Sequence, residues 1–383
     1  MDFDLTEEQQ LIRETARAFC DREIVPHARE WDRSERMDLG IVAKLAEIGF
    51  LGCGLPQEHG GMGLDTVSYC VVMEELGRAD SSVRGIVSVN NGLAGKTIAK
   101  WGTEEQKVEW LPKLCTGEAL GCYGLTEPGS GSDPASLITR AQRDGDSWVI
   151  DGSKIFITLG SWAGVALVFA RSGDEGARGI TCFLVPTASE GFSARKIDGK
   201  LGLRAQDTAE IVLEGVRVPD AARLGDEGAG FKVAMSALDN GRISLAAGSV
   251  GIAQGCVDAS VAYAAERRQF GKPIAAFQLV QELIADMAVE TEAARMLAWR
   301  AAHLSDSGRS YTLAASQAKY YASEVAVRAA NAAVQVHGGY GYVDEFPVQK
   351  YLRDARVSTL YEGTSQIQKL LIGRALTGES AFV

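Results

Sequence analysis

One carboxylate near the end of the chain is a candidate for general acid–base chemistry. Glu362 lies in Tyr361-Glu-Gly-Thr-Ser-Gln366, at a predicted helix boundary. A positioned carboxylate can take a proton from a bound substrate. It can equally serve as a negative charge that interacts favourably with the N-terminus of the following helix. The residues themselves leave both interpretations open.

A dense cluster of glycines and hydroxyl groups lies about one third of the way along the chain. It reads Tyr123-Gly-Leu-Thr-Glu-Pro-Gly-Ser-Gly-Ser-Asp133. Glycines let the backbone approach a planar or phosphorylated ligand, and Thr126, Ser130 and Ser132 supply hydroxyl groups. The cluster has no GxGxxG sequence followed by a helix, so a Rossmann dinucleotide site is not supported. Taken alone, it is typical of a surface loop.

Three further segments could contact a ligand, although each has a purely structural interpretation. Phe156-Ile-Thr158 ends a predicted strand, where ordinary packing would explain it. Arg267-Arg-Gln-Phe-Gly-Lys-Pro273 ends a predicted helix, where arginine is favourable without a ligand but could also bind a pyrophosphate. Gln335-Val-His-Gly-Gly-Tyr-Gly341 ends another helix and alone would be a C-cap.

The bulk composition is that of a folded, soluble protein. The 383 residues are 46% hydrophobic, and 50 acidic against 39 basic residues give a formal net charge of −11. This length is sufficient for two or three hydrophobic cores, and the acidic balance argues against a duplex nucleic-acid binder. The longest apolar stretches are too short to cross a bilayer, and the acidic start is unlike a signal or transit peptide. We therefore expect no membrane span.

The cysteines and histidines favour a reduced protein, in the cytoplasm, without a metal. An odd number of scattered cysteines and the absence of a CxxC pair argue against a disulfide scaffold. The four histidines lack metal-ligand spacing, so we expect no metal site. These residues are Cys20, Cys53, Cys70, Cys115, Cys122, Cys182 and Cys256, and His27, His59, His303 and His337.

The hydrophobic period divides the chain into three predicted domains. Residues 1–120 show a helical period, with capping boxes at Thr6-Glu-Glu-Gln9 and Thr103-Glu-Glu-Gln106 and a helix that starts at Asp65. Residues 121–225 contain short β-branched runs, with Asp151-Gly152, Ser172-Gly173 and Glu190-Gly191 as turns. Residues 226–383 are alanine-rich and predict three or four long helices in a bundle. The expected fold class is α+β, with an antiparallel β-barrel between two helical domains.

The order and spacing of the motifs resemble those of the acyl-CoA dehydrogenases, over essentially the whole chain. The matching stretches are LTEPGSGSD at 125–133, KIFIT at 154–158, KLGLR at 200–204, ERRQFGKPI at 266–274, QVHGGYGY at 335–342 and YEGTSQIQ at 361–368. The resemblance implies FAD held between the β domain and the C-terminal helices, in a homotetramer built from two dimers. Phe156 and Leu159 depart from the family pattern, where tryptophan and asparagine are common.

The resemblance also implies roles for particular residues. Some contacts to FAD would come from the neighbouring subunit, through the segments near 267–278 and 335–339. Substrate contacts would come from Ser132, Asp239, Gly241, Arg242 and Gly363. The implied FAD contacts are Tyr123, Leu125, Thr126, Gly131, Ser132, Phe156, Ile157, Thr158, Arg267, Gln269, Phe270, Gln278, Gln335, Val336, Gly338, Gly339, Thr364 and Gln366.

The family places its catalytic carboxylate at one of two chain positions, which here are Glu362 and Gly241. Because glycine cannot abstract a proton, the resemblance assigns the base to Glu362. The implied reaction is α,β-dehydrogenation of a saturated acyl-CoA to a trans-2-enoyl-CoA, with transfer of a hydride to FAD and an electron-transfer flavoprotein as the acceptor. Three alternatives stay open: an acyl group on a carrier protein, an oxidase that reduces oxygen directly, and a silent flavin-binding relative.

Overall fold

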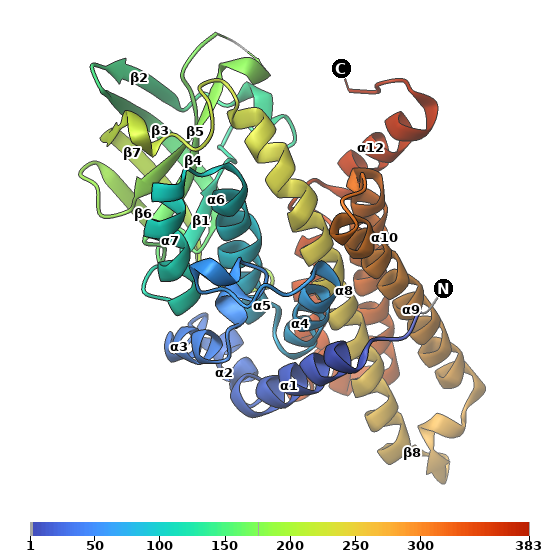
Figure 1. Ribbon diagram of the computed structural model, residues 1–383. Helices are drawn as coiled ribbons and strands as arrows, with labels where there is room; N and C mark the ends of the chain where they lie inside the picture. The colour runs from blue at the N-terminus through green and yellow to red at the C-terminus, as the bar shows by residue number, and fades with distance from the viewer. Residues whose placement is uncertain (1–2, 175, 383) are drawn as a thin grey trace.

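The computed structural model describes residues 3–174 and 176–382, so the outermost residues of the predicted terminal domains lie outside the described part. Helices form the first part of the chain, shown in blue to teal in Figure 1. The predicted capping boxes at Thr6 and Thr103 are both present, and Asp65 caps its helix by accepting from the Ser68 backbone N–H at 2.6 Å. The helices are α1 (Glu7–Glu23), α2 (Val25–Ser34), α3 (Gly40–Glu47), α4 (Thr66–Ala79), α5 (Ser81–Val87), α6 (Lys96–Trp101) and α7 (Glu104–Thr116), with a π-helical segment, η3 (Ser88–Gly95), before α6.

The middle of the chain forms a curled sheet of seven strands. Its strand order is β1-β4-β2-β3-β7-β6, with β5 paired to β4. The antiparallel prediction is correct for four pairs, such as β4 with β5, where Val168 lies opposite Phe183. It is wrong for β1 and β2, which both run parallel to β4, because strands separated along the chain can pair in parallel through a long connection. The strands are β1 (Gly121–Gly124), β2 (Arg140–Asp144), β3 (Ser147–Thr158), β4 (Val165–Arg171), β5 (Ile180–Pro186), β6 (Phe192–Lys196) and β7 (Thr208–Pro219).

The predicted turn at Asp151-Gly152 is also wrong, because β3 continues through it. The pairing of β3 with β7 shifts register between Ile150 and Gly152, which marks an irregularity within a continuous strand. Gly152 has a φ of 151°, and a Cβ there would come within 2.4 Å of the Thr139 side-chain oxygen. The glycine therefore allows a close approach inside the sheet.

Long helices form the last part of the chain, as predicted. The bundle consists of α8 (Gly230–Glu266), α9 (Gln278–Asp306) and α10 (Thr312–His337), followed by α11 (Val348–Ser358) and α12 (Ser365–Thr377). Alanine has the highest helix propensity and lets these helices pack closely. The segment after α8 is more than a helix end, since β8 (Arg268–Gln269) and β9 (Lys272–Pro273) form a hairpin. Phe270 and Gly271 form its turn, both with positive φ.

Glycines set the contact between α4 and α8, which brings the N-terminal helices to the bundle. A Cβ at Gly77 would lie 2.3 Å from the Gly248 carbonyl oxygen, and one at Gly251 would lie 2.0 Å from the Glu74 carbonyl oxygen. The two backbones therefore touch at this crossing. In Figure 1, α8 runs diagonally between the sheet and the other C-terminal helices. This arrangement places α5 and η3, which follow α4, beside the middle of α8.

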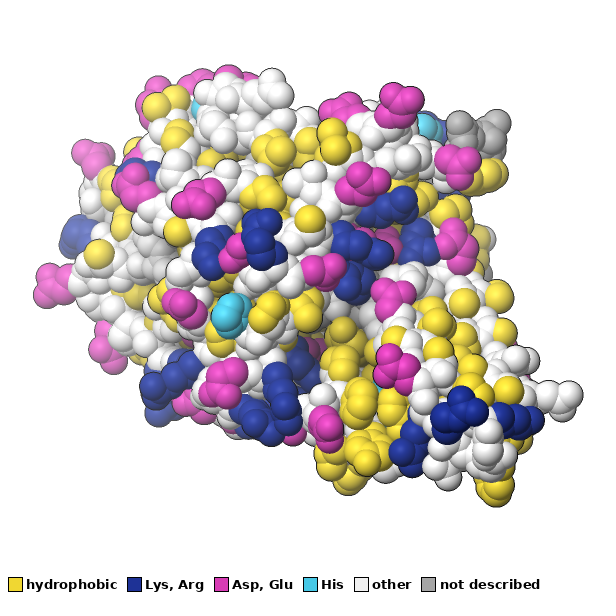
Figure 2. Space-filling model, turned by 90° about the horizontal axis from the view of Figure 1, so that it is seen from below, with side chains coloured by type: hydrophobic (Ala, Val, Ile, Leu, Met, Phe, Trp, Pro, Cys, Tyr) yellow, Lys and Arg dark blue, Asp and Glu magenta, His cyan; other side chains and the backbone are white. Residues whose placement is uncertain are grey.

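The surface carries charges of both signs, with one more apolar region. Figure 2 shows hydrophobic side chains gathered at the lower right of the view, on the side of the C-terminal helices. By length and hydropathy α8 could cross a membrane, but 67% of its most apolar window is buried inside the protein, as in a core helix. Large hydrophobic side chains exposed in the C-terminal part include Phe270, Leu279, Val289, Tyr342 and Val343.

Candidate active site

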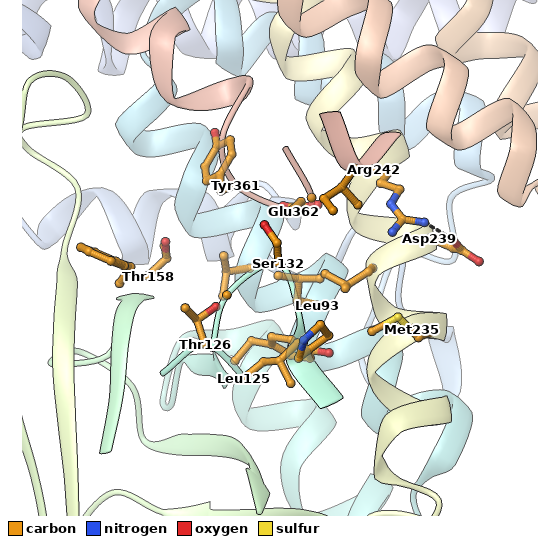
Figure 3. A pocket seen from close by; sticks show the side chains of 18 of the residues that line it. Leu93, Leu125, Thr126, Ser132, Thr158, Met235, Asp239, Arg242, Tyr361 and Glu362 are labelled. Atoms are coloured by element: carbon orange, nitrogen blue, oxygen red, sulfur yellow. Dashed lines mark hydrogen bonds and ion pairs between the residues drawn. The ribbon is translucent and has the colours of Figure 1, made fainter. Parts of the chain in front are cut away.

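A cavity of about 550 Å³ lies where the three parts of the chain meet. Its walls come from α5 and η3, from the loop after β1 and the end of β3, from α8, and from the loop and helix after α11. Figure 3 shows Glu362, Thr158, Ser132 and Arg242 around this space, although they are far apart in the sequence. The predicted site residues that line it are Tyr123, Leu125, Thr126, Gly131, Ser132, Phe156, Ile157, Thr158, Asp239, Arg242, Glu362 and Gly363.

Glu362 is held in an unusual backbone conformation between α11 and α12. Its φ is 54° and that of Gly363 is 88°, so both residues are in the left-handed region. A non-glycine residue there costs about 1 kcal/mol or more, and such strain is found at functional sites. The Oε2 atom of Glu362 is fully enclosed, and it has no hydrogen-bond partner within the described residues. This carboxylate oxygen is therefore not engaged in holding the fold together.

Three buried cations surround Glu362. Burial raises the pKa of the Glu362 carboxyl above its usual value, while Arg84, Lys319 and Arg242 oppose this by favouring the charged form. Burial in turn lowers the pKa of Lys319 to about 8 and also lowers the pKa of Arg242. The cations thus moderate the effect of desolvation, and the carboxyl still holds its proton more tightly than an exposed glutamate.

A buried ion pair fixes the glycine-rich loop that forms one wall of the cavity. The Lys154 ammonium lies 2.7 Å from Glu127 Oε1, and both side chains are almost completely buried. Lys154 also donates to the backbone carbonyls of Leu125 and Phe169, and Glu127 accepts from the backbone N–H groups of residues 138 and 139. Burial alone would raise the pKa of Glu127, but attraction to Lys154 and these hydrogen bonds lower it. The pair therefore ties the loop to β3 and β4.

The end of β3 presents Thr158 to the cavity. The pairing with β7 shifts register between Lys154 and Ile157, and Phe156 has a φ of 59°. The Thr158 hydroxyl accepts from the Gln206 side-chain amide at 3.1 Å, which leaves its own proton free for a ligand. Hydroxyl groups, glycines and a strand end around this cavity fit the ring of a flavin. The donors of this wall are thus compatible with FAD.

The opposite wall carries an ion pair on α8. Arg242 Nη1 donates to Asp239 Oδ1 at 2.6 Å, and Asp239 Oδ2 accepts from Thr312. Figure 3 shows the pair on the far side of the cavity from Thr158. Arg242 Nε has no hydrogen-bond partner in the part of the chain that the structure describes. One donor of the guanidinium therefore stays available beside the cavity.

The remaining predicted FAD contacts do not reach this cavity. Arg267, Gln269, Val336, Gly338 and Gly339 line a second cavity of about 580 Å³, at the end of α10 and the hairpin after α8. Its core is aromatic, with Tyr263 stacked on His337 at 4.3 Å between ring centres. The predicted residues that line neither of these two cavities are Gly241, Phe270, Gln278, Gln335, Thr364 and Gln366.

Two of these outlying residues still have defined places. Gly241 lies against Glu362, since a Cβ there would come within 2.3 Å of Glu362 Oε2. Thr364 caps α12 through its side chain, which accepts from the Ile367 backbone N–H at 3.2 Å. Phe270, by contrast, is 92% exposed at the tip of the hairpin and lines neither of the two cavities.

The sequence did not single out several residues that line the first cavity or hold its walls. Arg84 is buried on α5 and donates to the Tyr361 hydroxyl at 2.7 Å. Lys319 is buried on α10, and Gln206 holds Thr158. Neither Arg84 nor Lys319 lies in one of the motifs identified from the sequence, so no local signal marked them. Glu127 and Lys154 did lie inside two of the motifs, but only the folded chain shows that they pair.

Comparisons with known proteins agree with this arrangement. Residues 6–118, 122–216 and 228–377 match the models of the N-terminal, middle and C-terminal domains of acyl-CoA dehydrogenases. A probable acyl-CoA dehydrogenase of Bacillus subtilis is 45% identical over 98% of this chain and 100% of its own length. A short-chain specific acyl-CoA dehydrogenase of Clostridium acetobutylicum is 43% identical over 97% of this chain and 98% of its own.

Solved structures show the same fold. Butyryl-CoA dehydrogenase from Megasphaera elsdenii has a TM-score of 0.96 at 39% identity, over 98% of this chain and 100% of that one. A glutaryl-CoA dehydrogenase from Mycobacterium smegmatis in complex with FADH2 has a TM-score of 0.95 at 37% identity, over 99% and 97%. A chain from work on the electron transferring flavoprotein of Acidaminococcus fermentans has a TM-score of 0.97 at 42% identity, over 99% and 100%. The family expected from the motifs is confirmed: this chain belongs to the acyl-CoA dehydrogenases.

Proposed function

We propose that Glu362 is the catalytic base of this FAD-dependent acyl-CoA dehydrogenase. The supporting observation is the enclosed and unpartnered Glu362 Oε2 in a cavity that also contains Thr126, Ser132 and Thr158. A saturated acyl-CoA with its α-carbon beside Glu362 would give its α-proton to the carboxylate of that residue. FAD, when bound, supplies the acceptor for the hydride that leaves the β-carbon. The products are a trans-2-enoyl-CoA and reduced cofactor.

The protein's own groups would favour loss of the α-proton in three ways. Burial raises the pKa of Glu362 and so makes its ionised form a stronger base. The Glu362 backbone N–H makes no hydrogen bond within the described residues, so it can donate to the thioester oxygen as negative charge develops there. The walls of the cavity exclude water from the ionised carboxylate.

An anaerobic titration of the FAD-loaded protein with butyryl-CoA tests this proposal. Loss of the visible absorption of oxidised flavin should follow substrate addition. Glu362→Gln should retain FAD and slow this bleaching by about 10² to 10⁴-fold, the usual contribution of a positioned base. Asp239→Asn is a matched carboxylate-to-amide control that should alter substrate binding more than the rate at saturation. Bleaching at the normal rate in Glu362→Gln would disprove the assignment of the base.

Arg84 favours a second candidate substrate, an acyl-CoA whose acyl group ends in a carboxylate. Arg84 is buried and lines the same cavity, and its guanidinium donates a hydrogen bond to the Tyr361 hydroxyl. Ser88 lines this part of the cavity as well, and its hydroxyl contacts that of Ser244 at 2.9 Å. Arginine suits a carboxylate, because its planar fork of donors matches two oxygens. The glutaryl-CoA dehydrogenase from Mycobacterium smegmatis, which shares this fold, makes the same class of substrate worth testing.

Comparison of butyryl-CoA with glutaryl-CoA separates the two candidates. If Arg84 binds a carboxylate, glutaryl-CoA should bleach the flavin faster in the unmodified protein. Arg84→Gln should then lose the advantage of glutaryl-CoA over butyryl-CoA, and any slowing caused by loss of the Arg84 charge near Glu362 should affect both substrates alike. If butyryl-CoA is the better substrate in both proteins, the second candidate fails while the first stands.

The proposal includes a homotetramer of two dimers in the cytoplasm, with an electron-transfer flavoprotein as the acceptor. The second cavity supports the assembly. It is lined by residues predicted to contact FAD that do not line the first cavity, so they could reach the FAD of a neighbouring subunit. The exposed hydrophobic side chains of the C-terminal part also suit contacts between subunits. Light scattering during gel filtration would measure the mass of the assembly, and reoxidation by a purified electron-transfer flavoprotein would test the acceptor.

A further inference from the structure

The turn that presents Glu362 is held from outside by two buried side chains. Lys319 Nζ on α10 donates to the Gly363 carbonyl oxygen at 2.7 Å. Gln368 on α12 donates from its side-chain amide to the carbonyl oxygens of Glu362 and Gly363, at 3.1 and 3.2 Å. Both side chains have no exposed surface. Two carbonyls of the turn are therefore fixed by donors from different helices.

These contacts explain how the strained turn persists. A glutamate with positive φ is maintained only where its surroundings hold it there. A Cβ at Gly363 would come within 2.5 Å of the Gln368 amide nitrogen, so the turn and its donors fit closely. Glu324, further along α10, accepts from the Ser365 hydroxyl at 2.5 Å. The helix α10 thus holds the segment from Gly363 to Ser365 at two points.

Lys319 differs from the other donors because it carries a charge. The Lys319 ammonium donates to the neutral Gly363 carbonyl. Burying an ammonium without an ion pair costs free energy of folding. The charged groups that act on it are Glu362 and Glu324, which stabilise the ammonium, and Arg242, which destabilises it. Lys319 in turn favours the ionised form of Glu362, together with Arg84 and Arg242. A neutral donor would satisfy the Gly363 carbonyl without this electrostatic effect.

We propose that Lys319 is a positioning residue for the base: it holds the Glu362–Gly363 turn through the Gly363 carbonyl, and its positive charge favours the carboxylate form of Glu362 that removes the proton. This inference rests on the proposed function of Glu362 and adds a role for a residue outside the motifs. Gln368 holds the same turn without a charge. The two residues therefore separate the mechanical contribution from the electrostatic one.

The test compares the pH dependence of flavin bleaching by butyryl-CoA in FAD-loaded variants. Lys319→Met should move the acid limb of the rate to higher pH by about one unit, because loss of a nearby opposite charge raises the pKa of a carboxyl. At a pH below this limb, Lys319→Met should react about tenfold more slowly than the unmodified protein. Lys319→Arg should restore the position of the limb. Gln368→Leu, the uncharged control, should slow bleaching without moving the limb.

Other results would overturn the inference. An acid limb in Lys319→Met that coincides with that of the unmodified protein would show that the charge does not act on Glu362. If Lys319→Met does not fold, Lys319→Gln, which keeps a donor but lacks the charge, decides the question in the same way. Failure of the proposed function itself looks different, since the unmodified protein would then show no bleaching by any acyl-CoA.

Discussion

Gly241 on α8 lies directly against the carboxylate of Glu362, so that a Cβ at position 241 would fall 2.3 Å from Glu362 Oε2. It would also come within 3.0 Å of the Leu93 side chain. The family resemblance pointed to these two positions as alternative places for the base. In this chain they meet in one space, and the glycine leaves that space to the carboxylate. A side chain at position 241 would therefore occupy the space that the Glu362 carboxylate fills.

Gly241→Ala should therefore lower activity without lowering stability. The added methyl group displaces the Glu362 carboxylate, and a misplacement of about 1 Å can cost 10²-fold in rate. Replacing glycine by alanine in a helix interior stabilises the helix by up to about 1 kcal/mol. Rapid-mixing measurements of flavin bleaching and the midpoint of thermal unfolding would show the two effects separately.

Gly373→Ala is the control for this substitution. Gly373 also lies within a helix, but a Cβ there would have no heavy atom within 4 Å. Gly373→Ala should stabilise the helix in the same way and leave the rate of flavin bleaching unchanged. An equal loss of rate in both variants would show that position 241 has no special relation to Glu362.

The raised pKa of Glu362 predicts that Glu362→Gln stabilises the protein at neutral pH. The folded chain holds this proton to a higher pH than the unfolded chain, whose carboxyl titrates near 4.5. Ionisation therefore costs stability as the pH rises from about that value through the folded-state pKa. Glutamine avoids this cost. Thermal midpoints across this range should diverge in favour of Glu362→Gln as the pH rises, and a constant difference would contradict the raised pKa.

The sequence predicted well most features that are set by neighbouring residues, although the turn expected at Asp151-Gly152 is wrong. The caps at Thr6, Asp65 and Thr103 depend on a side chain and a backbone N–H three residues away, so their pattern is visible in the chain. The catalytic candidate and the glycine-rich loop were found through their motifs. The short strand β6, by contrast, has alternating partial exposure and no strongly apolar run, so it was missed.

Features that depend on distant segments were not predicted. The parallel pairing of β1 with β4 follows from how the sheet curls, which no local period records. Arg84 stands in a run of small and apolar residues, and its place in the cavity results from the crossing of α4 and α8. Lys319 lies in an alanine-rich helix, where a lysine is usually solvated. Only the tertiary structure turns these two residues toward Glu362.

The buried pair of Lys154 and Glu127 should be essential for holding FAD as well as for stability. Lys154→Met leaves the Glu127 carboxylate buried without its cation, which costs about 3–5 kcal/mol. The loop that carries Leu125 and Thr126 then loses the side-chain contacts from Lys154 and keeps the backbone hydrogen bond from the Ile155 N–H to the Thr126 carbonyl. We expect a lower midpoint of thermal unfolding and a lower ratio of FAD to protein after gel filtration.

The double variant Lys154→Met/Glu127→Gln is the control. It removes the unpaired charge and keeps an acceptor for one of the two backbone N–H groups, of residues 138 and 139, which bond to different oxygens of Glu127. It should recover much of the stability lost in Lys154→Met. If the double variant is less stable than the single one, the penalty does not come from an unpaired carboxylate.

Arg267 should act on the FAD of a neighbouring subunit. It lines the second cavity and lies over the Tyr340 ring at 5.4 Å, but it does not line the cavity that contains its own Glu362. Arg267→Gln should weaken FAD binding by about ten- to a hundredfold, the loss of one charge-assisted hydrogen bond. Arg268→Gln is the matched control, because Arg268 is exposed, donates to the Gly271 carbonyl and does not line the second cavity.

Mixed oligomers decide whether this contact acts between subunits. Arg267→Gln and Glu362→Gln chains, carrying different affinity tags, are co-expressed and the mixed species is isolated by two purification steps. In a mixed pair, the Arg267→Gln subunit keeps its own Glu362 and receives the intact Arg267 of its neighbour, so its FAD site is complete. Bleaching by butyryl-CoA at limiting FAD should therefore exceed that of either parent. If the mixed species is no more active than the average of the two parents, Arg267 serves its own chain, and the second cavity is not part of a shared FAD site.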